Sequence, residues 1–290
     1  YPAQGTYITL GGAMYQGAVI KDLLVNIPLK NLNRHGLIAG ATGTGKTKTL
    51  QSLTENLSKA GVPTLLMDLK GDLSGIAAIG EEKSFIKERH AQMNLPYTPE
   101  AFPVELLTIS KQDGVRLRAT VSEFGSVLLS RILDLSDVQE GVLAVIFKYC
   151  DDHEYPLLDL KDLKKVLQYA TEEGKSEFEA EYGRVASSST SAILRKIVEL
   201  ENQGAELFFG ERSFETEDLL HTDEKGRGVV NIIRLTDIQD RPKMFSTFML
   251  CLLAEIYNTF PEIGDQDKPK LVIFIDEAHL IFNQASKALL

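Results

Sequence analysis

The sequence predicts an α/β fold, with a mostly parallel sheet flanked by helices, on the basis of three observations. Residues 35–67 follow the order strand, glycine-rich turn, helix and strand, which is a βαβ unit and requires parallel strands. Residues 271–275 form a continuous apolar run, as in strands that are buried on both faces. Helical periodicity dominates most of the chain between these two segments.

The composition is that of an ordinary globular protein, since 43% of the 290 residues are hydrophobic and 25% are charged. It excludes collagen-like, disordered and coiled-coil proteins. The longest apolar runs, such as residues 248–254, fall well short of the roughly 20 residues of a membrane-spanning helix. No secretory leader opens the sequence. We therefore expect a cytoplasmic protein without a membrane partner.

The net charge is −10, from 41 acidic and 31 basic residues. A protein that coats nucleic acid with its whole surface is normally basic, so any contact of this chain with nucleic acid must be local. Lys111, Arg116 and Arg118 form one small basic cluster, which either faces nucleic acid or belongs to a solvated loop.

The cysteines and histidines do not indicate a redox centre or a structural metal. Cys150 and Cys251 lie in apolar stretches without CxxC spacing, which predicts buried thiols in a reducing compartment. The 5 histidines show no ligand spacing.

The N-terminal part of the chain predicts several regular elements in succession. Residues 5–29 mix glycine with short alternating apolar runs and predict two or three strands. Residues 35–39 predict a short buried strand, residues 46–59 an amphipathic helix, and residues 62–67 a further strand.

The middle of the chain, residues 81–228, lacks strong strand patterns and predicts a large helical insertion. Its helical patterns cover residues 123–133, 136–149, 160–170 and 191–202. Strand patterns return at residues 228–235 and 271–275, with a helix near residues 242–260 between them. The predicted organisation is a short N-terminal β segment (1–33), an α/β core (34–80 and 229–290) and the helical insertion (81–228).

Residues 40–47 read GATGTGKT and fit the phosphate-binding pattern G-x-x-x-x-G-K-[ST], also called Walker A, at every fixed position. Glycines let successive N–H groups point into one concavity, and the following helix adds its positive end. Lys46 would reach the β and γ phosphates, and the Thr47 hydroxyl would bind Mg²⁺. The predicted nucleotide-binding residues are Gly40, Ala41, Thr42, Gly43, Thr44, Gly45, Lys46, Thr47 and Lys48. The predicted cofactors are ATP and Mg²⁺.

An acidic pair, Asp276 and Glu277, follows the apolar run at residues 271–275 and fits a Walker B position. Asp276 would hold Mg²⁺ through water, and Glu277 would polarise the water that attacks the γ-phosphate. An adjacent Asp-Glu pair is typical of hydrolytic motor ATPases. Switch GTPases and many small kinases lack the second carboxylate of such a pair. This sequence also contains no N-K-x-D motif, which GTPases use to recognise guanine.

A second polar segment follows the predicted strand at residues 62–67. Asp68 or Lys70 would sense the γ-phosphate or orient Glu277, because open parallel sheets bind ligands at the carboxyl ends of their strands. A plain turn at the strand end is the alternative.

Several blocks of the sequence resemble bacterial HerA-like ATPases of the HerA/FtsK group. They are residues 33–47 (NRHGLIAGATGTGKT), 68–75 (DLKGDLSG), 208–211 (FFGE), 268–271 (KPKL) and 276–280 (DEAHL). The resemblance covers most of the chain, insertion included. It implies a homo-hexameric ring that binds ATP between subunits and moves double-stranded DNA through its pore as a translocase or helicase. It also implies a nuclease or other protein partner, and an arginine supplied by the neighbouring subunit.

The chain departs from this family at both ends. HerA has a β-barrel ahead of the phosphate loop, whereas only a short segment precedes Gly40 here. In this class the strand after the acidic pair lies beside the phosphate-loop strand and ends in a polar sensor. This chain ends at Leu290, soon after Glu277. We therefore expect the C-terminal core strands to be missing from this chain.

The sequence favours a Mg²⁺-dependent ATP hydrolase that moves along double-stranded DNA. The alternative is a nucleotide-gated binding or scaffold protein whose helical insertion docks a protein partner. The negative net charge of the chain agrees with this alternative. A small-molecule kinase is disfavoured by Glu277. Two further features stay open: Phe208 and Phe209 either stack on a base or anchor the insertion, and His279 either relays nucleotide state or is a core histidine.

Overall fold

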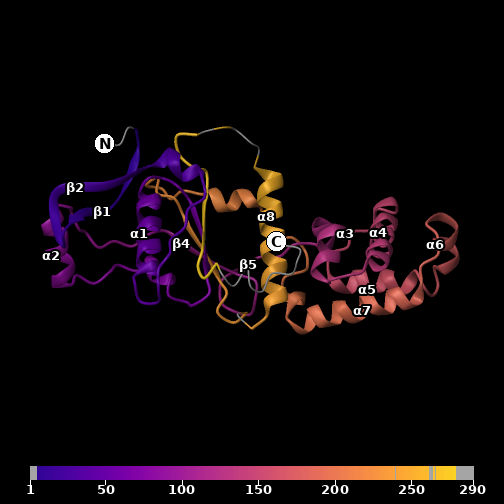
Figure 1. Ribbon diagram of the computed structural model, residues 1–290. Coiled ribbons are helices and arrows are strands. Elements are labelled where there is room, and N and C mark those ends of the chain that lie inside the picture. Colours follow the sequence, from indigo (N-terminus) through magenta and orange to yellow (C-terminus); the bar gives the residue numbers. More distant parts are fainter. Residues whose placement is uncertain (1–4, 239, 261–263, 265, 279–290) are drawn as a thin grey trace. The chain divides into compact units, whose positions relative to one another are not determined.

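The computed structural model describes residues 5–238, 240–260, 264 and 266–278 (Figure 1). The chain divides into two compact units. Unit 1 consists of Tyr1–Leu107, Glu215–Arg234 and Pro261–Asp276, and unit 2 of Thr108–Phe214, Leu235–Phe260 and Glu277–Leu290.

Unit 1 combines an N-terminal hairpin with α-helices and most of the main sheet. The hairpin is β1 (Tyr7–Tyr15) and β2 (Ala18–Pro28), and the helices are α1 (Lys46–Lys59) and α2 (Ser84–Met93). The sheet strands are β3 (Thr64–Asp68), β4 (Val104–Thr108), β6 (Val230–Arg234) and β7 (Val272–Ile275). Short 3-10 helices lie at Leu29–Asn33, Ser74–Ala77 and Thr216–Leu220.

The main sheet has five strands in the order β5-β4-β6-β3-β7, where β5 is Val115–Arg116. Strand β3 pairs in parallel with β6 on one side and with β7 on the other. All of its residues are buried, as expected for a parallel strand covered on both faces. Met67 lies opposite both Ile233 and Ile275, so three strands reach the same edge together. The parallel α/β fold predicted from the sequence is confirmed.

Helix α1 packs its apolar face onto this sheet. Leu50 belongs to one core cluster with Leu66 of β3 and Val230 of β6. Leu57, two turns further along, belongs to a second cluster with Ile8 of the hairpin. The predicted helix at residues 46–59 is confirmed, and its apolar positions explain why it lies here.

The C-terminal end of α1 is fixed by a close backbone approach. The Ser58 hydroxyl donates to the Gly228 carbonyl at 2.6 Å, and the Gly228 amide donates to the Ser58 carbonyl at 2.8 Å. A Cβ atom on Gly228 would lie 2.2 Å from the Val62 backbone, so only glycine fits. The helix is thereby anchored just before β6 begins.

Unit 2 is mainly helical. Its α-helices are α3 (Val121–Ile132), α4 (Asp137–Asp152), α5 (Leu160–Tyr169), α6 (Lys175–Glu181), α7 (Ser187–Asn202) and α8 (Pro242–Thr259). A 3-10 turn lies at Ala205–Leu207. Helix α3 begins with a capping box between Thr120 and Glu123 and is kinked at Gly125, whose φ is +74°.

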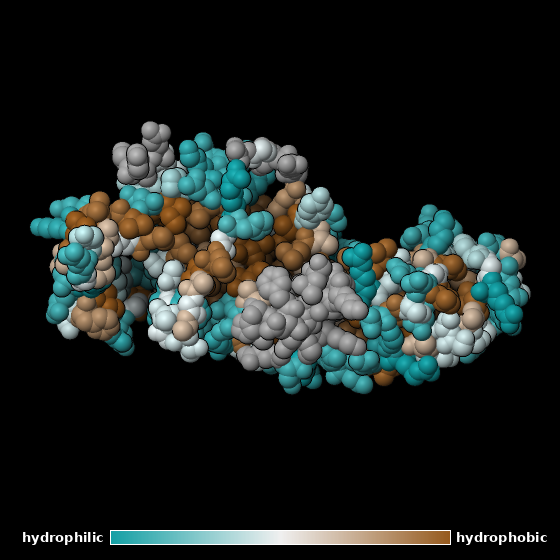
Figure 2. Space-filling model, viewed as in Figure 1, coloured by the Kyte–Doolittle hydropathy of each residue, from teal (hydrophilic) through white to brown (hydrophobic). Residues whose placement is uncertain are grey.

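The hairpin exposes apolar side chains, of which Tyr15 is 67% and Leu23 50% accessible. Figure 2 shows apolar surface in the part of the view where β1 and β2 lie.

Among the described residues, no helix is both long enough and apolar enough to cross a membrane.

The predicted strand at residues 35–39 is wrong. These residues have no regular secondary structure, and Leu37 is 87% exposed. A strand needs a neighbour for its backbone hydrogen bonds, and residues 35–39 are not among the strands of the sheet, whose order is β5-β4-β6-β3-β7. Apolar composition alone therefore did not make this segment a strand.

The sequence also missed two strands in the segment predicted to be helical, residues 81–228. Most of this range is helical, but it includes β4 and the two-residue β5. Strand β4 reads VELLT, with a charged Glu105 that is exposed, so its apolar run is too short to stand out. The proposed division of the chain into core and insertion remains a prediction.

Cys150 is buried and Cys251 is half-buried, and both are free thiols. Burial raises the pKa of the Cys150 thiol to about 11 and that of the Cys251 thiol to about 12. Both thiols are therefore protonated at neutral pH, which agrees with structural rather than reactive cysteines.

The position of β3 leads to a first testable prediction. Leu66 is fully buried in β3, so Leu66→Ala should lower the free energy of unfolding by about 2–5 kcal/mol. The matched control is Leu37→Ala, because Leu37 is 87% exposed and its truncation should change stability by less than about 0.5 kcal/mol. Urea denaturation measures both values. A large loss of stability in Leu37→Ala would mean that residues 35–39 are part of the core.

Candidate functional site

The phosphate loop (residues 40–47) turns directly into α1. Gly43 and Gly45 have φ values of +79° and +95°, a region that L side chains rarely adopt. A Cβ atom on Gly40 would lie 2.5 Å from the Thr44 hydroxyl oxygen. Glycine at positions 43 and 45 therefore suits the backbone conformation of the loop, and Gly40 lets the Thr44 side chain approach closely.

The loop is closed by hydrogen bonds to one carbonyl. The Ala41 oxygen accepts from the Thr44 amide at 3.3 Å, from the Thr44 hydroxyl at 2.7 Å and from the Lys46 ammonium at 3.1 Å. Lys46 thus folds back over the loop that it follows. An anion bound in the loop would offer this ammonium a stronger, charged acceptor.

The N-terminus of α1 is open to such an anion. Its N-cap is Gly45, no side chain caps the helix, and the first turn contains no acidic residue. The first N–H groups of a helix have no partner within it and carry its positive end. Thr47 is half-buried in this first turn. The residues present therefore fit a phosphate chain.

The acidic pair follows β7. Asp276 is 9% exposed and comes directly after Ile275, which lies opposite Met67 of β3. Asp276 follows β7 and Asp68 ends the neighbouring parallel strand β3, so both lie at the same edge of the sheet. Glu277 is half-buried with a φ of +50°, an unfavourable conformation for a side chain of this type.

The Thr47 hydroxyl and the Asp276 carboxylate are the oxygen donors that a hard cation such as Mg²⁺ prefers. Over the described part of the chain, no three His, Cys, Asp or Glu side chains gather as a metal cluster. A role of Thr47 and Asp276 in binding Mg²⁺ together with a nucleotide stays a prediction.

Asp68 organises the loop after β3. It is 1% exposed, and its carboxylate accepts the Gly71 amide at 2.7 Å and the Leu73 amide at 3.3 Å. Both carboxylate oxygens thus hold the turn that carries the exposed Lys70. This geometry favours a turn-forming role for Asp68, and a sensor role for Lys70 stays a prediction.

The sequence missed a polar connection from α1 to this loop. The Gln51 side-chain amide donates to the Asp72 carbonyl at 2.9 Å, and the Lys48 ammonium donates to the Gln51 oxygen at 2.9 Å. The spacing of Lys48 and Gln51, three residues apart on one helix, is the signal that could have indicated the second contact.

Phe208 and Phe209 are 1% and 2% exposed. Their rings lie edge-on to Phe248 at 5.7 Å and Phe124 at 5.5 Å, measured between ring centroids. They anchor the core of unit 2 and are not accessible for stacking on a base. His279, the other feature left open by the sequence, lies outside the described residues.

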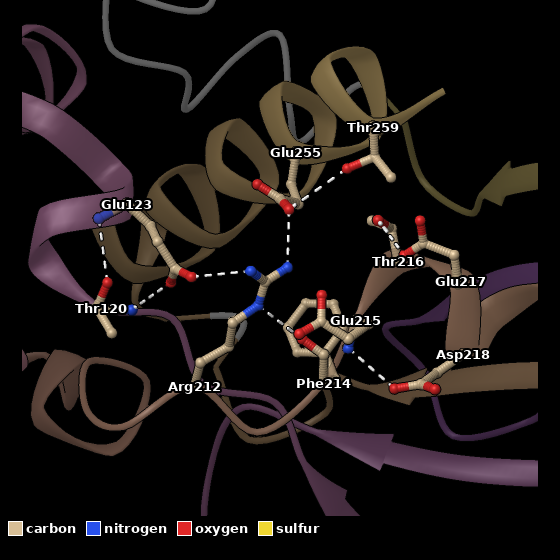
Figure 3. Close-up of polar contacts among 10 residues, drawn as sticks. All are labelled: Thr120, Glu123, Arg212, Phe214, Glu215, Thr216, Glu217, Asp218, Glu255 and Thr259. Atoms are coloured by element: carbon tan, nitrogen blue, oxygen red, sulfur yellow. Dashed lines mark hydrogen bonds and ion pairs between the residues drawn. The ribbon is translucent and has the colours of Figure 1, made fainter. Parts of the chain in front are cut away.

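Arg212 of unit 2 makes polar contacts with Glu123, Glu255 and Phe214 (Figure 3). Its Nη1 lies 3.1 Å from a Glu123 carboxylate oxygen, its Nη2 donates to Glu255 at 2.9 Å, and its Nε donates to the Phe214 carbonyl at 3.1 Å. It joins the first turn of α3 to α8. Beside it, Arg118 lines a cavity of about 170 Å³. Arg212 was not predicted, since the two carboxylates that it contacts, Glu123 and Glu255, are distant in sequence.

Comparison with known families identifies the chain. Residues 16–290 match the family model described as "Helicase HerA-like C-terminal". The chain belongs to this HerA-like family. The match confirms the resemblance that the phosphate loop and the acidic pair suggested, and it places the chain among P-loop ATPases.

Solved structures that match the chain include VirB4 of Thermoanaerobacter pseudethanolicus, at 16% identity and a TM-score of 0.49, covering 99% of this chain and 72% of VirB4. The bacterial conjugative coupling protein TrwB without its first 70 residues, in its unbound form, matches at 16% identity and a TM-score of 0.49. The match covers 99% of this chain and 69% of that TrwB chain. The plasmid coupling protein TrwB in complex with a non-hydrolysable GTP analogue matches at 11% identity and a TM-score of 0.45, covering 99% of this chain and 78% of TrwB. A comparison with curated proteins finds no match.

The phosphate loop leads to a second prediction. Gly45→Ala should destabilise unit 1 by about 1–2 kcal/mol, because its φ of +95° is strained for any residue with a Cβ atom. Gly36→Ala is the control, since a Cβ atom there meets nothing within 4 Å and its φ is ordinary. Urea denaturation measures the difference. Equal stability of the two variants would contradict the loop conformation described above.

Proposed function

We propose that this protein is a Mg²⁺-dependent ATP hydrolase that couples turnover to movement on double-stranded DNA. The observation that carries this proposal is the phosphate loop, in which Lys46 lies over a glycine-shaped turn and the helix N-terminus is uncapped. Membership of the HerA-like family supports the same activity.

In the proposed reaction, the loop amides and the N–H groups of α1 bind the phosphates. Lys46 exchanges the Ala41 carbonyl for the β and γ phosphate oxygens. Thr47, and Asp276 through water, would hold Mg²⁺, which would supply positive charge to neutralise the developing charge on the phosphate oxygens. Glu277 accepts a proton from the attacking water.

Several finer parts of the proposal rest on the family. They are assembly as a homo-hexamer, ATP bound between subunits with an arginine from the neighbour, DNA in a central pore, a nuclease or other protein partner and a cytoplasmic location. One TrwB structure is a complex with a non-hydrolysable GTP analogue, so the choice of ATP is to be tested against GTP.

The alternative function is a nucleotide-gated scaffold, in which the helical segment at residues 81–228 docks a protein. The net charge of −10 favours it, because an acidic surface disfavours nonspecific DNA binding.

A third prediction tests the catalytic role. Glu277→Gln should bind ATP with unchanged affinity and lower kcat by about 100-fold or more, because the proton acceptor is lost. Glu224→Gln, an exposed acidic residue of unit 1, is the matched control and should behave as the wild type. Steady-state hydrolysis and nucleotide titration measure both. Wild-type turnover in Glu277→Gln would remove Glu277 from this role.

A fourth prediction separates the translocase from the scaffold. Duplex DNA should stimulate the ATPase of the hexamer, and the stimulation should fade between 50 and 200 mM salt if it depends on phosphate contacts. The measurement is the ATPase rate with and without duplex DNA at both salt concentrations, together with the size of the assembly. A rate that DNA leaves unchanged would favour the scaffold.

A further inference from the structure

We infer that Gln51 couples nucleotide occupancy of the phosphate loop to the loop after β3, residues 69–76, here called the β3 loop. The inference rests on the proposed nucleotide binding at residues 40–47. It assigns Gln51 as a positioning residue, which acts on the site through the β3 loop and does not touch the nucleotide.

The β3 loop is attached to α1 by a polar and an apolar contact. The Gln51 amide donates to the Asp72 carbonyl at 2.9 Å. Leu50, the preceding residue of α1, lies in the same core cluster as Leu73 and Ile76 of the β3 loop. Leu50 is 6% and Leu73 0% exposed, so the apolar contact is dry. The apolar contact holds the β3 loop against α1, and the Gln51 hydrogen bond adds a polar link that connects the loop to Lys48.

The first part of the β3 loop is held together by hydrogen bonds to the Asp68 carboxylate. The buried Asp68 carboxylate accepts the amides of Gly71 and Leu73, which fixes both ends of the turn around Lys70. Gly71 has a φ of +81°, as such a turn requires. A shift at Asp72 would therefore move Lys70 with it.

Nucleotide occupancy reaches Gln51 through Lys48. The Lys48 ammonium donates to the Gln51 side-chain oxygen at 2.9 Å, and Lys48 lies in the first turn of α1, beside the phosphate loop. A triphosphate at the helix N-terminus would attract this exposed ammonium and compete with Gln51 for it. The Gln51 amide, which links Lys48 to Asp72, would respond first.

The position of the β3 loop connects this coupling to turnover. It begins at the carboxyl end of β3, and Asp276 follows the neighbouring β7 at the same edge of the sheet. A nucleotide-dependent shift of the β3 loop would therefore set the place of Lys70 relative to Asp276. The expected consequence is an effect on turnover rather than on nucleotide affinity.

The test is amide hydrogen exchange with and without Mg²⁺ and a non-hydrolysable ATP analogue. In the wild type, the analogue should slow exchange in residues 40–50 and change it in residues 69–76. Gln51→Ala and the isosteric Gln51→Glu, which both lack the N–H donor, should keep the first effect and lose the second. Both variants should also lower kcat about fivefold and leave KM unchanged. A change in rate of about fivefold corresponds to the net free energy of one hydrogen bond.

Asn56→Ala is the matched control, because the Asn56 amide donates within α1, to the Ser52 carbonyl at 2.7 Å, and does not reach the β3 loop. It should behave as the wild type. A nucleotide effect on residues 69–76 that persists in both Gln51 variants would overturn the inference and leave the proposed function intact. If the analogue leaves residues 40–50 of the wild type unchanged, the proposed function fails and the inference fails with it.

Discussion

The candidate site depends on the parallel pairing of β3 with a strand on each side. Strand β3 is buried throughout, and Met67 aligns with Ile233 of β6 and Ile275 of β7. The carboxyl ends of the three strands therefore meet at one edge, as in other open α/β sheets that bind ligands there. Asp68 and Asp276, distant in sequence, become neighbours along this edge because of that register.

Helix α1 is the second element on which the account depends, because it has three roles at once. Leu50 and Leu57 hold it on the core, its uncapped N-terminus faces the phosphate loop, and Gln51 bonds the β3 loop. A rigid helix that joins a binding loop to a neighbouring turn is a short physical path for coupling. The path consists of contacts that can be removed one at a time.

The sequence predicted those parts of the fold that depend on local pattern. The helix at residues 46–59, the strand that became β3 and the glycine requirement at Gly45 all follow from spacing and residue type, and the structure has each of them. The strand at residues 35–39 failed because a strand also needs a partner, which no local pattern encodes. The short strand β4 was missed because its apolar run is only a few residues long.

The site was predictable to a similar extent. The motif identified Lys46, but the contact of its ammonium with the Ala41 carbonyl required the structure. Asp68 stood out as a polar residue at a strand end, whereas its two backbone bonds, which make it part of a turn, depend on the fold. Gln51 carries no motif at all, because its importance comes from Asp72, 21 residues away.

The central claim is that the phosphate loop binds a nucleoside triphosphate through Lys46 and the open end of α1. Isothermal titration of the wild type and of Lys46→Ala with ATP in the presence of Mg²⁺ tests it directly. The account predicts saturable binding by the wild type and at least about tenfold weaker binding by the variant, since a charged hydrogen bond to phosphate is lost. Equal affinity of the two proteins, or no binding by the wild type, would contradict it.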